Sequence, residues 1–522
     1  MQKKLLAVAV LSAFSGLAAA QSANVTLYGT IVQNVEQVSA TGGDNSVVGT
    51  SVSSARGGSV GGTRVTGAVN AAGATDQGNR FRFNPAGTNF GIRGTEDLGN
   101  GLSAWFQMEL AAQIGNSPPN AGTNHGTAAS YRNTAVGLRS NTWGTVLFGM
   151  WDTPFNVMVG NTNANGRIGG ASQGHHANLL GGNAFAQGAV SGQATAAWCT
   201  PVAGLNGGPA GGGGTAAGCA NFGMNFDRRE RSSIQWWSPN WNGFEVRGAY
   251  NVTADTGGIT VDSQVGGLNA LKQNIWDLSL AYSNGPLYLG YAYERQNDTM
   301  AAAARTFNAG GIGAGEGATP GGGAWTMGNA TGASAASGAI PAGAAGTAQG
   351  VGDSYMSGSK GTGHRLGGKY TFDLGGSSSI GLGAMWESLK WDFTYGVRAG
   401  AAATASQNLT GLKKTAWRLQ GNYTFGSHFI GLDYVRANAM SGSIQSATAV
   451  ASNTFDGSGT SSRAWQLAYN YMLSKRTSIG AYYNTVRNDT NANYTGIVFG
   501  GITGVAPGSS PKYLGMQVRH SF

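Results

Sequence analysis

The chain has 522 residues, with 32 Lys and Arg against 23 Asp and Glu, and a formal net charge of +9 at pH 7. Charged residues make up only 11% of it and form no dense basic run, whereas an ordinary soluble domain carries about 25%. This composition argues against nucleic acid as a partner. Glycine, at 89 residues, is unusually abundant, but an aromatic content of 10% argues against a wholly disordered chain.

The first twenty residues have the layout of an export signal. Lys3 and Lys4 precede an apolar stretch over 5–14, and Ala18, Ala19 and Ala20 supply the small residues of a cleavage site. A membrane anchor is the alternative, but the apolar stretch is much shorter than the roughly 20 residues of a spanning helix. We therefore predict a cleaved signal peptide at 1–20 and one exported domain at 21–522.

Segments of alternating apolar and polar residues follow along the rest of the chain. In 102–110 the even positions are apolar, while the odd positions include Gln107 and Glu109, which is the period of a strand with two different faces. The sixteen segments with this habit lie at 24–38, 90–94, 102–110, 129–139, 144–151, 231–238, 243–252, 273–283, 286–296, 364–373, 379–394, 414–425, 428–437, 462–473, 477–488 and 513–522.

The connections between these segments alternate strictly in length. Seven are tight turns rich in Gly, Asn, Asp and Pro, as hairpins require. In an antiparallel barrel this alternation puts all long loops on one side and both termini on the other, periplasmic side. The eight long loops are predicted near 39–79, 112–128, 152–230, 253–272, 297–363, 395–413, 438–461 and 489–511.

A soluble β-sandwich or propeller would also alternate and carry turns. It has no reason to separate long from short connections by parity. Aromatic pairs near strand ends, such as Trp236 with Trp237 and Tyr482 with Tyr483, are typical of the aromatic girdles at membrane interfaces. The sequence therefore predicts an all-β chain that forms a 16-stranded antiparallel transmembrane β-barrel.

Several short motifs resemble the general diffusion porins of β-proteobacteria. They are Val25-Thr26-Leu27-Tyr28-Gly29, residues 91–99 (GIRGTEDLG), residues 144–149 (GTVLFG), residues 473–477 (LSKRT) and the ending Val518-Arg519-His520-Ser521-Phe522. The resemblance implies a homotrimer in the outer-membrane lipid, with the third long loop constricting the pore. It also implies that the C-terminal strand, ending in Phe522, is the assembly signal read by the barrel-assembly machinery.

The third long loop, 152–230, contains the two cysteines, Cys199 and Cys219. In an exported protein two cysteines at this spacing predict one disulfide that closes a loop, with two free thiols as the alternative. Two cysteines do not indicate a metal site, because structural metal sites generally use about four ligands. We expect no cofactor and no metal.

Charged residues beside the predicted constriction are the candidates for the pore. Arg93 alternates away from Phe90 and Ile92, so its guanidinium is expected to face water inside the barrel. A basic cluster facing an acidic loop would give a transverse field and a modest anion preference, although Met150 and Gln235 stand where related porins often have basic residues. The full candidate set is Arg93, Glu109, Arg132, Arg139, Asp152, Arg228, Arg229 and Arg231; later strands add Arg365, Lys369, Lys390, Lys414, Arg418 and Arg436 as a possible second basic wall.

The function that follows is a water-filled channel in the bacterial outer membrane for the passive diffusion of small hydrophilic solutes and ions. A substrate-specific channel is the first alternative, and an adhesin or structural barrel with a plugged lumen is the second. The histidines show no recognisable Ser/His/Asp order, and an enzyme is not expected.

Overall fold

The computed structural model describes residues 24–43, 77–85, 87–112, 130–165, 179–182, 226–252, 274–297, 354–355, 360–392, 395–396, 407–446, 452–455, 457–490, 492, 494–495 and 508–522. The predicted signal peptide and the cysteines Cys199 and Cys219 lie outside these ranges. Within the ranges, no helix has both the length and the apolar character needed to cross a membrane.

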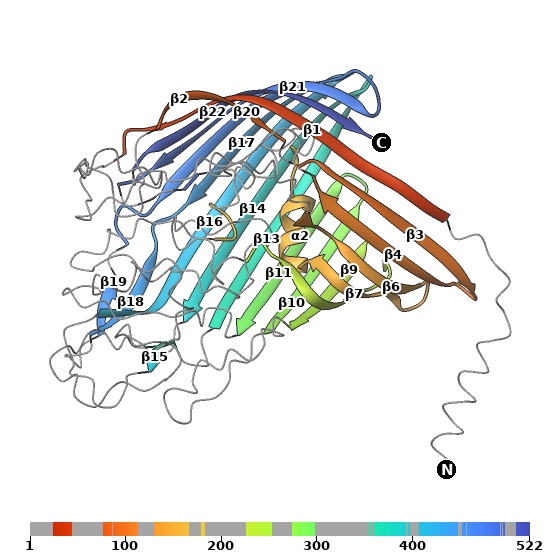
Figure 1. The fold of residues 1–522 in the computed structure, drawn as a ribbon, viewed down its shortest axis with the longest axis horizontal. Helices are drawn as coiled ribbons and strands as arrows, with labels where there is room; N and C mark the ends of the chain where they lie inside the picture. Colours follow the sequence, from red (N-terminus) through yellow and green to blue (C-terminus); the bar gives the residue numbers. More distant parts are fainter. Residues whose placement is uncertain are drawn as a thin grey trace, which may run out of the picture.

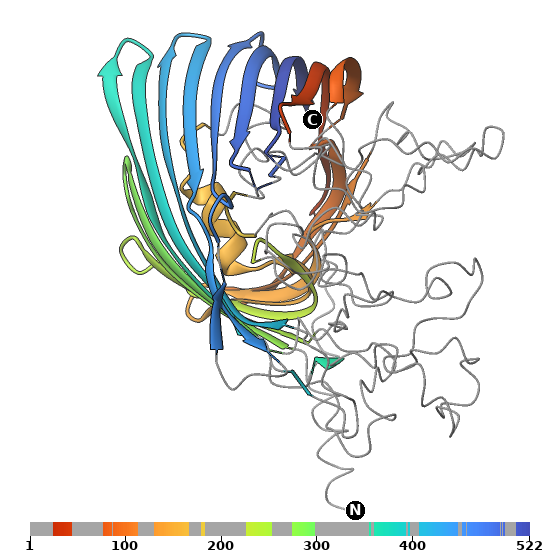
Figure 2. The same cartoon turned by 90° about the vertical axis from the view of Figure 1, so that its left-hand side faces the viewer.

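Sixteen antiparallel strands form one closed barrel (Figures 1 and 2). Each strand pairs with its neighbours along the chain, and the last pairs with the first from Thr30 opposite Ser521 to Thr41 opposite Ser510. The predicted fold class is therefore confirmed. The strands are β1 (Asn24–Thr41), β3 (Asn89–Gly99), β4 (Leu102–Ala111), β6 (Thr134–Ser140), β7 (Gly144–Asp152), β8 (Arg229–Trp237), β9 (Phe244–Val252), β10 (Asn274–Asn284), β11 (Leu287–Asn297), β13 (Lys360–Gly375), β14 (Ser378–Asp392), β16 (Gln407–Phe425), β17 (His428–Ala437), β20 (Ser462–Met472), β21 (Thr477–Asn488) and β22 (Ser510–Ser521).

Shorter strands lie in ranges that the sequence predicted as loop or as part of one strand. The most regular is β2 (Gln77–Asn84), which pairs with Asn34–Ala40 of β1, while β3 pairs with Asn24–Thr30. The two strands are separated at Pro85, which has no backbone N–H to donate to a ladder. The remaining short strands are β5 (Ser130–Tyr131), β12 (Ser354–Tyr355), β15 (Tyr395–Gly396), β18 (Ser441–Ser446) and β19 (Ser452–Phe455).

The tight turns have the backbone that their residues favour. Asn100 and Gly101, between β3 and β4, have φ of 53° and 74°, and Gly376 and Ser377, between β13 and β14, have φ of 60° and 65°. Positive φ at both central residues is the requirement of the hairpin turn whose twist matches that of the flanking strands.

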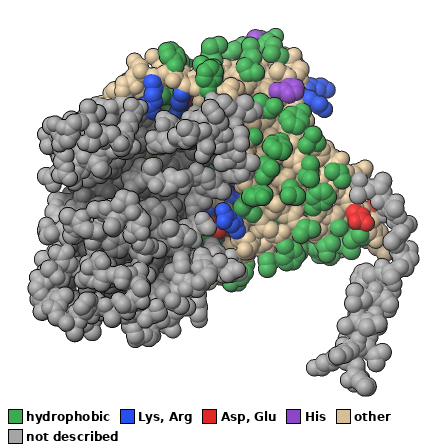
Figure 3. All heavy atoms as spheres, viewed as in Figure 1, with side chains coloured by type: hydrophobic (Ala, Val, Ile, Leu, Met, Phe, Trp, Pro, Cys, Tyr) green, Lys and Arg blue, Asp and Glu red, His purple; other side chains and the backbone are tan. Residues whose placement is uncertain are grey.

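The two faces of the strands differ as a membrane barrel requires. On β17, Ile430 and Leu432 face outward and are 41% and 48% exposed, whereas the next residue, Asp433, faces inward and is buried. The space-filling view shows apolar side chains spread over the outside of the strands (Figure 3). An apolar exterior and a polar interior reverse the pattern of a soluble protein and are the signature of an outer-membrane barrel.

Candidate functional site

The loop that follows β7 turns into the barrel instead of away from it. Its first described segment contains helix α2 (Pro154–Asn161), which lies inside the ring of strands (Figure 2). Thr153 is the N-cap, with its hydroxyl accepting a hydrogen bond from the Asn156 N–H at 3.3 Å, and Pro154 occupies the first turn. This is the helix start that a Thr-Pro pair favours, since proline needs no hydrogen-bond acceptor at that position.

Two acidic side chains from β10 and β11 hold the start of α2 against the wall. The Phe155 N–H donates to Asp277 Oδ1 at 2.9 Å, and the Thr153 hydroxyl donates to Glu294 Oε2 at 3.2 Å. Asp277 and Glu294 are cross-strand partners, and both are buried. A helix N-terminus carries free N–H groups and partial positive charge, so acidic partners stabilise it.

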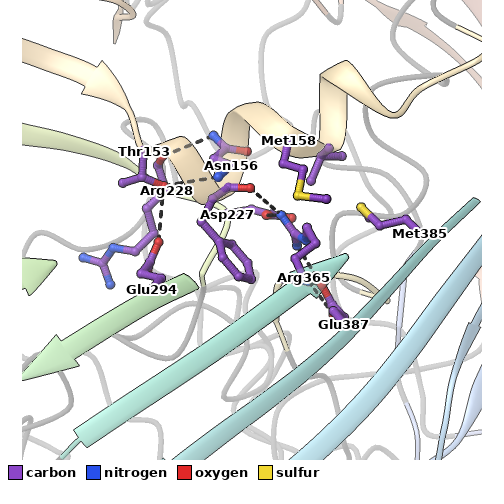
Figure 4. Close-up of polar contacts among 12 residues, drawn as sticks. Thr153, Asn156, Met158, Asp227, Arg228, Glu294, Arg365, Met385 and Glu387 are labelled. Carbon is purple, nitrogen blue, oxygen red and sulfur yellow. Dashed lines mark hydrogen bonds and ion pairs between the residues drawn. The ribbon is translucent and has the colours of Figure 1, made fainter. Parts of the chain in front are cut away.

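Arg365 of β13 joins three parts of the interior (Figure 4). Its Nη1 donates to the Phe155 carbonyl at 2.8 Å and to Asp227 Oδ1 at 2.7 Å, and its Nη2 donates to Glu387 Oε2 of β14 at 2.7 Å. The guanidinium also lies 4.1 Å from the centre of the Phe155 ring. Arg365 and Glu387 are fully buried. Because Arg365 also bonds Phe155 and Asp227, the pair attaches both ends of the loop to the wall, at α2 and just before β8.

A second pair of loop segments completes the attachment. The Gly181 N–H donates to Glu387 Oε1 at 2.9 Å, and the Phe226 N–H donates to the Gly181 carbonyl at 2.6 Å. Lys414 of β16 donates to the Gly182 carbonyl. The stretches 179–182 and 226–228, far apart in the sequence, therefore meet on the same part of the inner wall as α2.

The segment after α2 continues across the next strands of the wall. Asn163 Oδ1 accepts from Gln420 Nε2 at 2.9 Å and from Arg418 Nη2 at 3.1 Å. The Asn165 side chain donates to the Leu432 carbonyl at 2.8 Å. Arg418 is also paired with Asp433 at 2.7 Å. These bonds attach the segment after α2 to β16 and β17 on the inside of the barrel.

Three of the predicted pore residues lie together on the wall of β3, β4 and the approach to β6. The Tyr28 hydroxyl donates to Glu109 Oε2 at 3.0 Å, Arg132 forms an ion pair with Glu109, and the Arg93 guanidinium lies 4.9 Å from the Tyr28 ring centre. Arg93 thus lies on the inner side, as its alternation predicted. Tyr28, which joins the cluster, was quoted only as part of a motif and not as a candidate.

Asp152 and Arg229 form a second cluster at the ends of β7 and β8. Arg229 Nη2 is 3.0 Å from Asp152 Oδ1, and Arg229 Nε donates to Asn133 Oδ1 at 2.7 Å. Asn156 of α2 donates to Asp152 Oδ1 at 3.1 Å. Because Arg132 and Asn133 are adjacent, this cluster and the Glu109 cluster occupy neighbouring parts of the wall.

The other three candidates have different surroundings. Arg228 forms a buried ion pair with Glu230, and Arg231 is exposed on β8. Arg139 lies 5.5 Å from the centre of the Trp105 ring. That ring belongs to a cluster with Trp151 and Trp237, whose centroids are 5.6–6.5 Å apart.

The later basic residues do not form the second basic wall considered from the sequence. Arg365, Lys414 and Arg418 do face inward, but each is buried against an acid or a carbonyl. Lys369 also faces inward on β13, with its ammonium 6.0 Å from the centre of the Tyr288 ring. Lys390 and Arg436 stand at outward positions of β14 and β17, where they alternate with buried inward residues. Strand parity alone could have separated these two from the others.

The acids that hold the loop were missed by the sequence reasoning. Asp277, Glu294 and Glu387 sit on strands that were predicted, at inward parity, but their partners are 122, 141 and 22 or more residues away, respectively. An acidic residue at an inward position of a strand is the signal that could have found them, because buried charges need partners.

Comparison with known proteins identifies the family. A sequence model described as Gram-negative porin matches residues 7–386. The chain belongs to the Gram-negative porins. It is accordingly an outer-membrane protein, and it crosses that membrane as a β-barrel.

Relatives of this porin are distant. An outer membrane porin protein of Bordetella pertussis is 27% identical over 303 residues, which cover 57% of this chain and 60% of the relative's own length. The anion-selective porin from Comamonas acidovorans has the same fold, with a TM-score of 0.50, 16% identity and coverage of 96% of this chain and 100% of that one. OmpT of Vibrio cholerae gives a TM-score of 0.48 with 12% identity, covering 97% and 100%.

Proposed function

We propose that this porin forms a water-filled channel for passive diffusion of small hydrophilic solutes and ions, and that the α2 segment of its third long loop narrows the channel. The observation that carries the proposal is the attachment of this segment inside a closed barrel, where Arg365 bonds the Phe155 carbonyl, Asp227 and Glu387 at once. A loop held on one side of a wide lumen reduces its cross-section and leaves a polar path beside it.

A modest preference for anions follows from which charges are paired. Glu109, Asp152 and Asp433 each form an ion pair with an arginine. Arg93 and Arg139 instead lie over aromatic rings, and neither pairs with a carboxylate in the part of the chain that the structure describes. Asp277 and Glu294, which are also inward, are buried against the start of α2, so the surplus charge on the exposed part of the lumen wall is positive. The Comamonas relative, which is described as anion-selective, agrees with this sign.

Two further features belong to the same proposal. The chain is expected to assemble as a homotrimer, as the family resemblance implies, and its C-terminal strand is expected to engage the barrel-assembly machinery through Phe522. Phe522 exchanges two backbone hydrogen bonds with Gly29, at 3.0 and 3.1 Å, so it belongs to the seam that closes the barrel. A disulfide between Cys199 and Cys219 stays a prediction outside the described residues.

A hydrolytic role gains no support from the histidines that can be described. His364, His428 and His520 bond to Tyr291, Tyr469 and Thr477 at 2.8–2.9 Å, and they occupy outward positions of their strands. Side chains on the lipid-facing side are remote from any aqueous substrate in the lumen.

Single-channel recording in a planar bilayer tests the proposal directly. The refolded mature protein should give stepwise conductance that grows linearly with voltage, with closures in groups of three if it is a trimer. Under a salt gradient the reversal potential should have the sign of an anion preference. Concentration-dependent block by one solute would favour a substrate-specific channel, and insertion without conductance would contradict the proposal.

A further inference from the structure

Three tryptophans meet on the inner face of the barrel, and we call them the tryptophan cluster. They are Trp105 of β4, Trp151 of β7 and Trp237 of β8, with ring centroids 5.6–6.5 Å apart. Trp105 and Trp237 lie near the ends of β4 and β8 that meet tight turns, whereas Trp151 reaches them from the other end of β7. Lumen-facing positions of an outer-membrane barrel are usually polar, so three indoles together depart from that pattern.

Strand alternation places these rings inside the barrel. On β8, Trp237 shares its parity with the buried Gln235, whereas Trp236 between them is outward. Trp105 is 7% exposed and belongs to a small buried core, and Trp151 and Trp237 pack on that core while staying partly exposed. The aromatic surface that stays accessible therefore faces the lumen. Such a surface, beside a few polar groups, is typical of a site for small molecules.

The three rings meet at an angle and do not form a parallel stack. The planes of Trp105 and Trp151 are 82° apart, and those of Trp151 and Trp237 are 59° apart. A planar solute beside them can lie parallel to one indole and edge-on to another, and both geometries are favourable for aromatic pairs. Guanidinium groups lie over Trp105 and Trp237, whereas within the described ranges none lies over Trp151. Trp151 is therefore the indole with a face available to a solute.

Two arginines flank the cluster and leave one positive charge uncompensated. Arg247 lies 4.7 Å from the centre of the Trp237 ring and forms an ion pair with Glu245 at 2.5 Å. Arg139 lies 5.5 Å from the centre of the Trp105 ring, is exposed, and pairs with no carboxylate in the part of the chain that the structure describes. A guanidinium can donate two parallel N–H groups to one carboxylate. The free cation beside the cluster therefore suits a solute with a single carboxylate.

We infer that the tryptophan cluster, together with Arg139, is a binding subsite for small aromatic monocarboxylates that pass through the channel. The solute's ring lies against Trp151 and its carboxylate bonds the Arg139 guanidinium. Both residues are next to Trp105, at 5.7 and 5.5 Å from the centre of its ring. Binding has to be weak enough for the solute to leave again. The inference rests on the proposed function, because a solute reaches the cluster only through an open lumen.

Current through single channels in a planar bilayer tests this inference. Phenylacetate is added to a channel that conducts KCl, at constant ionic strength, and the fall in current gives a half-saturation concentration. Three matched solutes are compared with it: acetate has the carboxylate without the ring, 2-phenylethanol has the ring without the charge, and cyclohexylacetate has the charge with a ring that is not aromatic.

Phenylacetate should have the lowest half-saturation concentration of the four solutes. It should be about tenfold below those of acetate and 2-phenylethanol, since the ring contact and the charge-assisted bond each contribute up to about tenfold in affinity. Cyclohexylacetate keeps the charge and the apolar area, so the difference from phenylacetate should be about threefold, which is the part specific to aromatic contacts.

Substitutions in the cluster locate the subsite. Trp151→Leu should raise the half-saturation concentration of phenylacetate about tenfold, whereas Trp151→Phe keeps a ring and should stay within about threefold of the unaltered porin. Arg139→Gln should raise the value for phenylacetate about tenfold and leave that for 2-phenylethanol unchanged, because only the charged solute bonds the guanidinium.

Two outward variants serve as controls. Trp386→Leu removes an indole of β14 that is 45% exposed on the outside, and Lys413→Gln removes an outward cation of β16. Both should give the half-saturation concentrations of the unaltered porin. Absence of KCl current would contradict the proposed function, and the inference with it. With normal KCl current, equal half-saturation concentrations for phenylacetate and acetate, or for Trp151→Leu and the unaltered porin, would overturn the inference alone, as would a current that never saturates.

Discussion

At the scale of single residues, the interior is organised by arginines with three kinds of partner. Arg365 is buried between carboxylates and a backbone carbonyl. Arg229 forms a partly exposed ion pair with Asp152, and Arg93 lies over the Tyr28 ring. The sequence distinguishes inward from outward positions through strand parity. It does not reveal which inward arginine holds the loop, because that depends on Asp227 and Glu387, which come from other parts of the chain.

Replacing Arg365 should loosen the loop and destabilise the porin. In Arg365→Met, Glu387 loses its guanidinium partner while remaining buried, and breaking a buried pair in this way costs about 3–5 kcal/mol. Urea unfolding monitored by tryptophan fluorescence should give a lower free energy of unfolding, and single channels should be noisier. Lys390→Met breaks an exposed ion pair with Asp392 and should cost less than about 1 kcal/mol. Similar losses in the two variants would argue against the clamp.

The charge preference of the channel should depend on Arg93 and Arg139. The double variant Arg93→Gln, Arg139→Gln removes two inward cations that lie over Tyr28 and Trp105, so most of the anion preference should be lost. The reversal potential under a salt gradient measures this change. Lys413→Gln, an outward position, is the control, and it should leave the reversal potential unchanged. A control that shifted the potential as far as the double variant would mean that surface charge, not the lumen, sets the preference.

At the scale of elements, the long strands were predictable from the sequence, whereas the short strand β2 and the helix α2 were not. Strands such as β20 alternate cleanly because one side faces lipid and the other water. β2 was missed because it follows a long Gly-, Ser- and Thr-rich stretch and its alternation spans few residues. No helix was predicted in the third long loop. That this loop enters the barrel was expected from the family resemblance alone, since a Thr-Pro start is compatible with a helix and says nothing about the wall that it contacts.

The start of α2 should be sensitive to the Thr153 hydroxyl. Thr153→Ala removes the bond from the Asn156 N–H and the bond to Glu294, and loss of an N-cap costs about 1 kcal/mol. Hydrogen exchange at the Asn156 and Val157 amides should accelerate about fivefold, as that energy implies. Thr153→Ser retains the hydroxyl and should exchange like the unaltered porin. Unchanged protection in the alanine variant would indicate that hydrogen bonds to the backbone carbonyls of Thr153 and Phe155, and not the side-chain cap, hold the start of the helix.

At the scale of the whole molecule, closure depends on the two ends of the chain. β1 pairs with β22 over Thr30–Thr41 and with β3 over Asn24–Thr30. The Phe522 ring lies so close to Gly29 that a Cβ at position 29 would be 2.5 Å from Phe522 Cζ. Closing the sheet removes exposed strand edges. The last residue therefore has both a structural contact in the barrel and, by the family resemblance, a role in assembly.

These two roles of Phe522 can be separated experimentally. Phe522→Ala keeps the backbone bonds to Gly29, so the purified variant should still refold in detergent, with a modest decrease in thermal stability. In cells the folded, heat-modifiable form should decrease much more strongly if the assembly machinery reads the terminal ring. Equal decreases in cells and in detergent would assign the effect to barrel stability alone.

A row of outward basic residues near the loop end of β11 to β22, which includes Lys390, Arg436, Arg463 and Arg487, bears on how subunits would meet. It covers β11 to β22, whereas the outward residues near the loop end of β1, β2 and β3 are uncharged, including Gln37, Phe81 and Phe90. A face that repels its own copy through a row of arginines is a poor trimer contact, so we expect the subunits to meet through the N-terminal strands. A photo-crosslinking residue at Ile92 of β3 should give dimer- and trimer-sized products, whereas one at Leu432 of β17 should not. The two positions are matched, with 40% and 48% exposure in the single chain. Products from Leu432 alone would reverse the assignment, because the basic row would then lie at the subunit interface.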